Sequence, residues 1–474
     1  MTTVKRIAKN TGILFISSLF NYLFGFVYTI YSARYLGVSG FGILSFAIAL
    51  GTILAVFTDL GLGSLTTREI SRDTTLANKY LSNILSIKLI LSLFAFGFVV
   101  LFIQVFSYDY TIEAIYSIYI VCISYLLNNF SSIFYSVFNS YEKMEYQSIG
   151  QILNSFLILI GVFIVVFYSL DILGFALIYL VSSIIVLILN VILFTRNFFL
   201  PKFKKDTSFW KAIMKEALPL SFYVVFSIVA FRIDTIILSL LKGDAAVGIY
   251  TAGYKLMEAL LVVSAMYTTA IFPVLSKFYM TSKNNLKFSF KKSFKYLFML
   301  GLPIAVGVTL LSGQIIEIFY SESYNSSILV LQIVIWTIPF IFVNSLFRTT
   351  FTSINKQKLL LNTTLIGMAV NIVLNLLIIP IYGYIGSAVI TVLTEFIYFV
   401  ICFYYFNKYH FKIEITKIIY KPIIASLGLA LFIITTQFNL IIKIIIGTLI
   451  YFIILIATKY FSNEDLELFK KIFS

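Results

Sequence analysis

Long uncharged apolar stretches recur along this chain, and they restrict its fold more than any other feature. A helix that crosses the hydrocarbon core of a membrane needs about 20 consecutive apolar residues. With 60% hydrophobic and only 12% charged residues, a soluble fold of 474 residues could not bury its apolar surface. The sequence therefore predicts an all-α polytopic membrane protein with about 14 transmembrane helices, near residues 12–34, 41–62, 81–106, 112–136, 149–169, 172–194, 217–241, 247–272, 295–313, 326–348, 360–381, 384–406, 418–437 and 440–461.

The basic residues are distributed unequally between the two sides of these predicted helices. An even number of helices places both termini on one side, and the loops of that side carry 29 of the 35 lysines and arginines. The opposite side carries only Arg34, Lys242 and Lys443. Because lysine and arginine accumulate in cytoplasmic loops, we expect a multi-pass protein of the cell membrane with both termini in the cytoplasm. The net charge of +15 then reflects orientation and does not indicate nucleic-acid binding.

An internal repeat relates the two halves of the chain. Gly37 and Gly42, after the first apolar stretch, match Gly243 and Gly248, after the seventh, at an offset of 206 residues. This offset spans six helices, and an even number preserves orientation, so the halves are predicted to be parallel repeats. We expect two six-helix lobes, followed by two additional helices and a cytoplasmic tail, within residues 1–200, 201–410 and 411–474, respectively.

Four ionisable residues lie within two neighbouring apolar stretches. Arg232 and Asp234 lie in the seventh stretch. Lys255 and Glu258 lie in the eighth, where their i,i+3 spacing places them on one helix face. A rise of about 1.5 Å per residue places Arg232 and Lys255 at similar depth. Because charges within a membrane are costly, we interpret these residues as the lining of a polar cavity. The alternative is that they only neutralise one another within the bundle.

Four further charged residues lie in or beside apolar stretches. Asp59 and Lys88 lie near the terminus-side ends of the second and third stretches, and Arg34 lies at the outer end of the first. Glu395, near the middle of the twelfth, is the best candidate for a carboxylate that responds to a proton or cation. The alternatives are that Arg34 and Lys88 extend to the nearest interface, and that Glu395 pairs with a basic residue of another helix. Asparagines within the stretches are predicted mainly to form interhelical hydrogen bonds; they are Asn21, Asn128, Asn129, Asn154, Asn344, Asn371 and Asn375.

The sequence lacks the residue patterns of covalent catalysis and of cofactor binding. Its two cysteines, Cys122 and Cys402, lie inside apolar stretches, and its single histidine is His410. These residues suggest neither a disulfide framework nor a metal site. There is no Gly-x-x-x-x-Gly-Lys-Ser/Thr loop for ATP. We therefore predict a protein without cofactor or metal that is not an enzyme.

Several short motifs follow one another in a recognisable order. They are Asn10-Thr11-Gly12, Ala33-Arg34-Tyr35-Leu36-Gly37-Val38-Ser39-Gly40-Phe41-Gly42, Phe57-Thr58-Asp59-Leu60-Gly61-Leu62-Gly63, Ala217-Leu218-Pro219-Leu220 and the turn from Gly243 to Tyr250. In this order they resemble the oligosaccharide/polysaccharide flippases, which are the lipid-linked-sugar exporters of the multidrug/oligosaccharidyl-lipid/polysaccharide exporter superfamily. The resemblance covers essentially the whole chain.

This resemblance implies a central cationic cavity between the two lobes and transport by alternating access. The substrate would be a polyprenyl phosphate- or pyrophosphate-linked oligosaccharide or polysaccharide repeat unit. It would move from the cytoplasmic to the outer leaflet, driven by a gradient of H+ or Na+. Membrane lipids and glycan-assembly proteins are the other expected partners. The candidate residues are Arg232, Lys255 and Arg34 for the lipid phosphate, and Asp234, Glu258, Glu395, Asp59 and Lys88 for the polar cavity and ion coupling.

The two alternative functions are a multidrug or cation antiporter and a membrane-embedded polysaccharide polymerase or ligase. A multidrug or cation antiporter of the same superfamily would have a mostly acidic cavity, whereas this chain places Arg232 and Lys255 at the depth of its acids. A membrane-embedded polysaccharide polymerase or ligase generally needs a sizeable external loop with catalytic residues. The longest predicted external loop, near residues 313–325, has only about a dozen residues.

Overall fold

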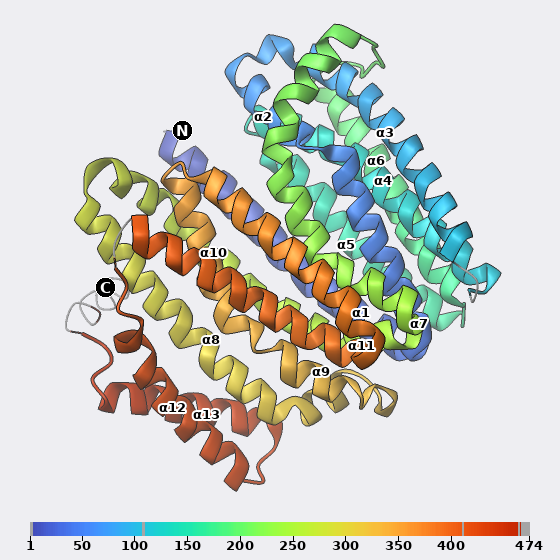
Figure 1. The fold of residues 1–474 in the computed structure, drawn as a ribbon. Helices are drawn as coiled ribbons and strands as arrows, with labels where there is room; N and C mark the ends of the chain where they lie inside the picture. Colours follow the sequence, from blue (N-terminus) through green and yellow to red (C-terminus); the bar gives the residue numbers. More distant parts are fainter. Residues whose placement is uncertain (1–2, 107–109, 410–411, 463–464, 466–474) are drawn as a thin grey trace. The chain divides into compact units, whose positions relative to one another are not determined.

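Helices make up all the regular secondary structure in the described part of the chain, which comprises residues 3–106, 110–409, 412–462 and 465 of a computed structural model (Figure 1). His410 lies outside these residues. Two short 3-10 helices, Thr74–Leu76 and Glu322–Tyr324, accompany thirteen α-helices. These are α1 (Thr3–Asp59), α2 (Leu62–Arg72), α3 (Ala77–Phe106), α4 (Ile112–Ser140), α5 (Met144–Phe167), α6 (Ile172–Asn197), α7 (Thr207–Thr281), α8 (Lys283–Phe319), α9 (Ser327–Val334), α10 (Thr337–Ser353), α11 (Gln357–Tyr409), α12 (Ile415–Thr435) and α13 (Leu440–Ala457).

Three helices are kinked at a single glycine that has left-handed backbone angles. Gly37 in α1 has φ 66° and ψ −175°, Gly243 in α7 has φ 77° and ψ 179°, and Gly383 in α11 has φ 55°. Residues with a Cβ atom rarely adopt these angles, which explains why glycine occupies the position. The nearly equal angles at Gly37 and Gly243 show that the two copies of the repeat share one backbone conformation at this glycine.

Eleven helical segments of the described residues are long and apolar enough to span a membrane. One of them comprises α9 and α10, which are separated at Ile335 and Trp336 because Pro339 has no N–H to donate to the carbonyl of Ile335. When each of the three helices kinked at glycine is counted as two crossings, the segments correspond to the fourteen predicted stretches. The prediction of an all-α polytopic membrane protein is therefore confirmed.

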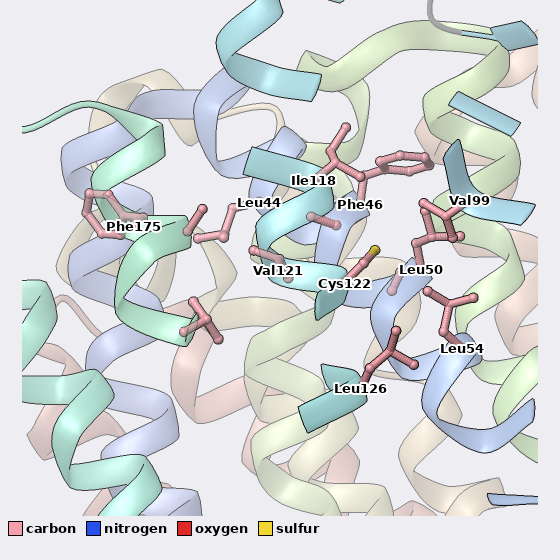
Figure 2. Packing of buried hydrophobic residues seen from close by; sticks show 14 of the residues in the cluster. Leu44, Phe46, Leu50, Leu54, Val99, Ile118, Val121, Cys122, Leu126 and Phe175 are labelled. Carbon is pink, nitrogen blue, oxygen red and sulfur yellow. The ribbon is translucent and has the colours of Figure 1, made fainter. Parts of the chain in front are cut away.

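The first compact unit contains residues 1–251 and 372–384. Within it, α4 packs against α1 and α6, and α5 packs against α1 and α6. Figure 2 shows the core between these helices, a single cluster that contains Phe46 and Leu50 of α1, Val121 and Cys122 of α4, and Phe175 of α6. All five side chains are buried, and Cys122 is a free thiol.

The second compact unit contains residues 252–371 and 385–474. Its central helix is α8, which packs against α9, α10, α12 and α13. The pair formed by α12 and α13 lies side by side (Figure 1) and shares a small core with α8 that includes Met299, Ala425 and Tyr451. The Tyr451 hydroxyl donates a 2.7 Å hydrogen bond to the main-chain oxygen of Met299. The last two helices are thus fastened to α8 by both apolar and polar contacts.

Candidate functional site

The two glycine turns of the repeat lie against each other within the first unit. A Cβ atom added to Gly42 would overlap the main-chain oxygen of Asp244, and one added to Gly248 would overlap the main-chain oxygen of Val38. Val38 and Asp244 are also separated by 206 residues, so the contact is reciprocal. Such a contact is expected between two copies related by a pseudo-twofold axis. Only glycine allows the two backbones to approach this closely.

A fully buried lysine joins three helices in the first unit. Lys88 of α3 has no exposed side-chain surface, and its Nζ donates to Oδ1 of Asp59 at 2.7 Å. It also donates to the main-chain oxygen and Oδ1 of Asn129 on α4, at 3.0 and 2.8 Å, and to the hydroxyl of Ser132 at 3.0 Å. The Asn129 amide donates in turn to Thr58 at 2.5 Å. Lys88 therefore lies inside the protein and does not extend to an interface.

Asp234 is buried within α7, with a side chain that is only 3% exposed. Its carboxylate accepts hydrogen bonds from the Tyr250 hydroxyl and from the main-chain N–H of Thr235, the latter at 2.7 Å. The half-buried guanidinium of Arg232 lies 5.0 Å from the centre of the Phe231 ring. The structure thus supplies Asp234 with a hydroxyl partner that the sequence does not suggest.

Lys255 and Glu258 form an ion pair on α7 within the second unit. The distance from Lys255 Nζ to Glu258 Oε2 is 2.6 Å, and the two side chains are 26% and 21% exposed. This pairing follows the predicted i,i+3 geometry.

Glu395 of α11 lies in a polar group contributed by two helices of the second unit. The Asn344 amide of α10 donates to Glu395 Oε2 at 2.8 Å, and Arg348 NH2 lies 3.8 Å from the same oxygen. The Arg348 guanidinium also lies 5.0 Å from the ring centre of Tyr398. Glu395 therefore lies beside a basic residue of another helix, Arg348, as in the alternative interpretation of the sequence.

Arg34 has an exposed side chain and lies three residues before the kink at Gly37. The main residues that the sequence does not identify are Arg348, Tyr250 and Ser132. Arg348 falls at the very end of a predicted stretch, where hydropathy does not distinguish it from a loop residue. Its i,i+4 spacing from Asn344 is the signal that could have placed it beside Glu395.

Comparison with known proteins identifies relatives that match most of the chain. The capsular polysaccharide biosynthesis protein CapF of Staphylococcus aureus is 23% identical over 84% of this chain and 99% of CapF. The probable low-salt glycan biosynthesis flippase Agl15 of Haloferax volcanii is 24% identical over 82% of this chain and 81% of Agl15. The membrane protein MJ1068 of Methanocaldococcus jannaschii is 24% identical, and the match spans 58% of its length and 60% of this chain.

A solved structure and two family profiles also match. The lipid II flippase MurJ, in an inward closed conformation, has a TM-score of 0.77 and 20% identity over 93% of this chain and 98% of that chain, which shows a shared fold. The MatE profile matches residues 219–377. The profile of the family described as polysaccharide biosynthesis protein matches residues 7–279, which is more than half of the chain. The chain therefore belongs to the polysaccharide biosynthesis protein family, within the multidrug/oligosaccharidyl-lipid/polysaccharide exporter superfamily.

Proposed function

We propose that this protein is a flippase for a lipid-linked oligosaccharide or polysaccharide repeat unit carried on a polyprenyl phosphate or pyrophosphate. Its role is that of a transporter and not that of an enzyme. The main supporting observation is that basic side chains within apolar helices lie beside carboxylates: Lys88 beside Asp59, Lys255 beside Glu258 and Arg348 beside Glu395. A phosphate group can replace a carboxylate at such a cation because both are acceptor anions. The names of CapF and Agl15 support the same function.

In this proposal Arg232 and Lys255 bind the lipid phosphate, and Arg34 assists them at the outer side. Arginine offers a planar fork of donors to two phosphate oxygens, and lysine acts as a compact point charge. The lobes comprise residues 1–200 and 201–410, with both termini in the cytoplasm. The reciprocal contact of Gly42 and Gly248 supports a symmetric pairing of the two repeats at this point. In this proposal the lobes separate there during alternating access.

A groove in the second unit offers a place for the polyprenyl chain. A cavity of about 270 Å³ lies between α8, α12 and α13, and most of its walls are aliphatic, including Ile304, Leu311, Leu429 and Ile433. Lys443 lines the same cavity as its single charged residue. An isoprenoid chain in a membrane is already out of water, so an apolar groove would hold it beside the protein by van der Waals packing.

Deletion of the gene tests the function. In a strain without a redundant flippase, we expect lipid-linked glycan to accumulate on the cytoplasmic leaflet and surface glycan to be lost. Complementation with Arg232→Ala or Lys255→Ala should fail, whereas the exposed Lys242→Ala should restore surface glycan as a matched control. Unchanged surface glycan in the deletion strain would exclude the function. Full complementation by both variants would exclude only the site.

In this proposal, competition between the substrate phosphate and Glu258 for Lys255 couples transport to an ion gradient. When substrate phosphate binds Lys255, Glu258 loses the counter-charge that lies 2.6 Å away and becomes the group that takes up H+ or Na+. Glu258→Gln should therefore still bind the lipid substrate, but an imposed ion gradient should no longer accelerate flipping in proteoliposomes. The exposed Glu322→Gln is the control and should respond like the wild type. A normal gradient response in Glu258→Gln would contradict this assignment.

The match to the MatE profile keeps a multidrug or cation antiporter as the second candidate. Glu258 and Glu395 are the acids that such an antiporter would use for a cationic drug. Overexpression should then raise resistance to cationic drugs, and Glu395→Gln should remove that resistance. Loss of surface glycan on deletion, without a change in drug susceptibility, favours the flippase.

A further inference from the structure

A basic cavity lies between the N-terminal part of α8 and the start of α12, apart from the charged residues within the apolar helices. It has a volume of about 330 Å³ and is lined by four lysines, Lys291, Lys292, Lys295 and Lys417, and by a single carboxylate, Glu414. Lys417 pairs with Glu414 at 2.5 Å. This hydrogen bond, together with the charges of nearby lysines, holds the pKa of Glu414 below its ordinary value. The cavity therefore has an excess of positive charge.

Two of these lysines already hold an anion that the protein itself supplies. The carboxylate of Asp465 accepts hydrogen bonds from Nζ of Lys292 at 2.5 Å and from Nζ of Lys295 at 2.6 Å. The Tyr296 hydroxyl and the main-chain N–H of Ser462 donate to the same carboxylate, at 2.7 and 2.8 Å. The side chains of Lys292 and Lys295 are 17% and 14% exposed, and that of Asp465 is buried. This end of α8 is thus built to bind an acidic group.

The cavity lies at the boundary between the charged N-terminal parts of α8 and α12 and their apolar stretches. Lys295 is the last charged residue of α8 before Glu317, and Lys421 is the last charged residue of α12. Phe288, which is 43% exposed, and Ile418 supply apolar walls to the cavity. Lysines that precede a membrane-spanning stretch, next to exposed apolar side chains, lie at the depth of lipid headgroups.

We propose that this cavity binds the phosphate of an acidic phospholipid headgroup, with Lys291 and Lys417 as its cations and Ile418 contacting the acyl region. Lys417 exchanges its partner Glu414 for the phosphate. Lysine attracts a phosphate ester as a point charge, and the apolar wall distinguishes a lipid from a soluble phosphate. Asp465 occupies the inner lysines and limits the positive charge that the lipid meets. The site goes beyond the proposed transport function, because the lipid here is a ligand of α8 and α12 and is not carried across.

Lipid binding to the purified full-length protein tests this proposal. Native mass spectrometry in detergent would measure the bound fraction of phosphatidylglycerol, with phosphatidylcholine as the neutral lipid. The double variant Lys291→Gln/Lys417→Gln should bind phosphatidylglycerol about 25-fold more weakly, since each lysine near an anionic headgroup contributes roughly a factor of five. Lys356→Gln/Lys358→Gln removes two exposed lysines of the same unit and should bind like the wild type. Equal binding by all three proteins would overturn the site.

Two further measurements test the role of Asp465 and distinguish a lipid headgroup from a free phosphate. Asp465→Asn releases Lys292 and Lys295 from their carboxylate partner, so it should strengthen binding of phosphatidylglycerol; unchanged or weaker binding would contradict the proposal. Competition by glycerol phosphate at the concentration of the lipid would show a site for free phosphate and overturn the lipid assignment. Neither measurement requires the transported substrate, so a negative result leaves the flippase proposal unaffected.

Discussion

At the residue scale, the two members of the ion pair formed by Lys88 and Asp59 differ in burial. Lys88 is fully buried, whereas Asp59 keeps 30% of its side-chain surface exposed. Removing Asp59 leaves a buried ammonium without a counter-charge, which costs about 3–5 kcal/mol. Removing Lys88 leaves a carboxylate that water reaches, at a cost of about 1–2 kcal/mol. We therefore predict that Asp59→Asn lowers the midpoint of thermal unfolding more than Lys88→Met does.

The two substitutions together provide the control for this prediction. In Asp59→Asn/Lys88→Met neither charge remains, so the midpoint should lie above that of Asp59→Asn alone. The midpoint of thermal unfolding of each variant can be measured by the intrinsic fluorescence of the protein in detergent. A larger loss in Lys88→Met than in Asp59→Asn would contradict the burial argument.

The depth of charged residues could be predicted from the sequence, but their partners could not. Hydropathy places Asp59 and Lys88 at similar depth near the same ends of neighbouring helices, yet nothing in the sequence shows that Asn129 would bring a third helix to them. Nor does the sequence indicate Tyr250 as a donor to Asp234, because helical spacing relates residues of one straight helix, and the kink at Gly243 lies between the two. Side-chain pairing across a kink depends on backbone angles that the sequence only suggests.

At the element scale, the turns at Gly42 and Gly248 approach so closely that neither position has room for a side chain. Gly42→Ala and Gly248→Ala place a methyl group where the opposite main-chain oxygen lies, and such overpacking costs about 1–3 kcal/mol. We predict that these variants separate the turns and shift the protein towards a conformation that is open at this side. Ser239, which is 5% exposed and hydrogen-bonded to Tyr110 at 2.6 Å, reports on this opening. A Ser239→Cys thiol should react several-fold faster with maleimide in the alanine variants.

The control for this prediction is an alanine at a glycine with open surroundings. Gly97 of α3 has no atom within 4 Å of an added Cβ atom, so Gly97→Ala should leave the reaction rate of Ser239→Cys unchanged. Alanine also favours helix over glycine at both sites, which excludes a loss of helix as the cause. Equal rates in Gly97→Ala and Gly42→Ala would show that the turns do not gate this side.

After α13, the carboxylate of Asp465 binds lysines of α8, and this contact has a defined dependence on pH. Burial alone would raise the pKa of Asp465, but hydrogen bonds from Lys292 and Lys295 outweigh it and hold the pKa well below its ordinary value. A depressed pKa adds stability above the unfolded value of about 4, and this stability is lost as the pH falls through the folded value. We predict that hydrogen exchange near Tyr460 stays slow from neutral to mildly acidic pH in the wild type. In Asp465→Asn it should be about tenfold faster at pH 7.

A matched variant tests the same contact from the other side. Lys292→Gln leaves Lys295 and Tyr296 as donors to Asp465, so it should accelerate exchange near Tyr460 less than Asp465→Asn does. If exchange in Asp465→Asn equals that of the wild type at pH 7, the carboxylate does not anchor the segment. Neither the sequence repeat nor the hydropathy pattern predicts this contact, because the acid and its lysines are about 170 residues apart.

At the scale of the whole molecule, hydropathy and the glycine repeat were sufficient to predict the fold. Fourteen apolar stretches correspond to the helical segments once the kinks at Gly37, Gly243 and Gly383 are counted. Backbone hydrogen bonds must be satisfied within a membrane, so an apolar stretch of sufficient length has one available secondary structure. The partners of the candidate site residues were less predictable, because they depend on which face of each helix turns inward and on contacts between distant parts of the chain.

The orientation of the chain in the membrane can be tested by labelling single substituted cysteines, because the native cysteines are buried. Cys122 and Cys402 are both buried, so the wild-type protein should react little with an impermeant maleimide in intact cells. Lys242→Cys lies in a turn on the side opposite the termini and should be labelled from outside. Lys204→Cys lies in the basic loop before α7 and should be labelled only after the membrane is permeabilised. Both substituted residues are exposed, so exposure alone cannot produce a difference between them. Labelling of Lys204→Cys in intact cells, with Lys242→Cys protected, would reverse the orientation and with it the direction of the proposed transport.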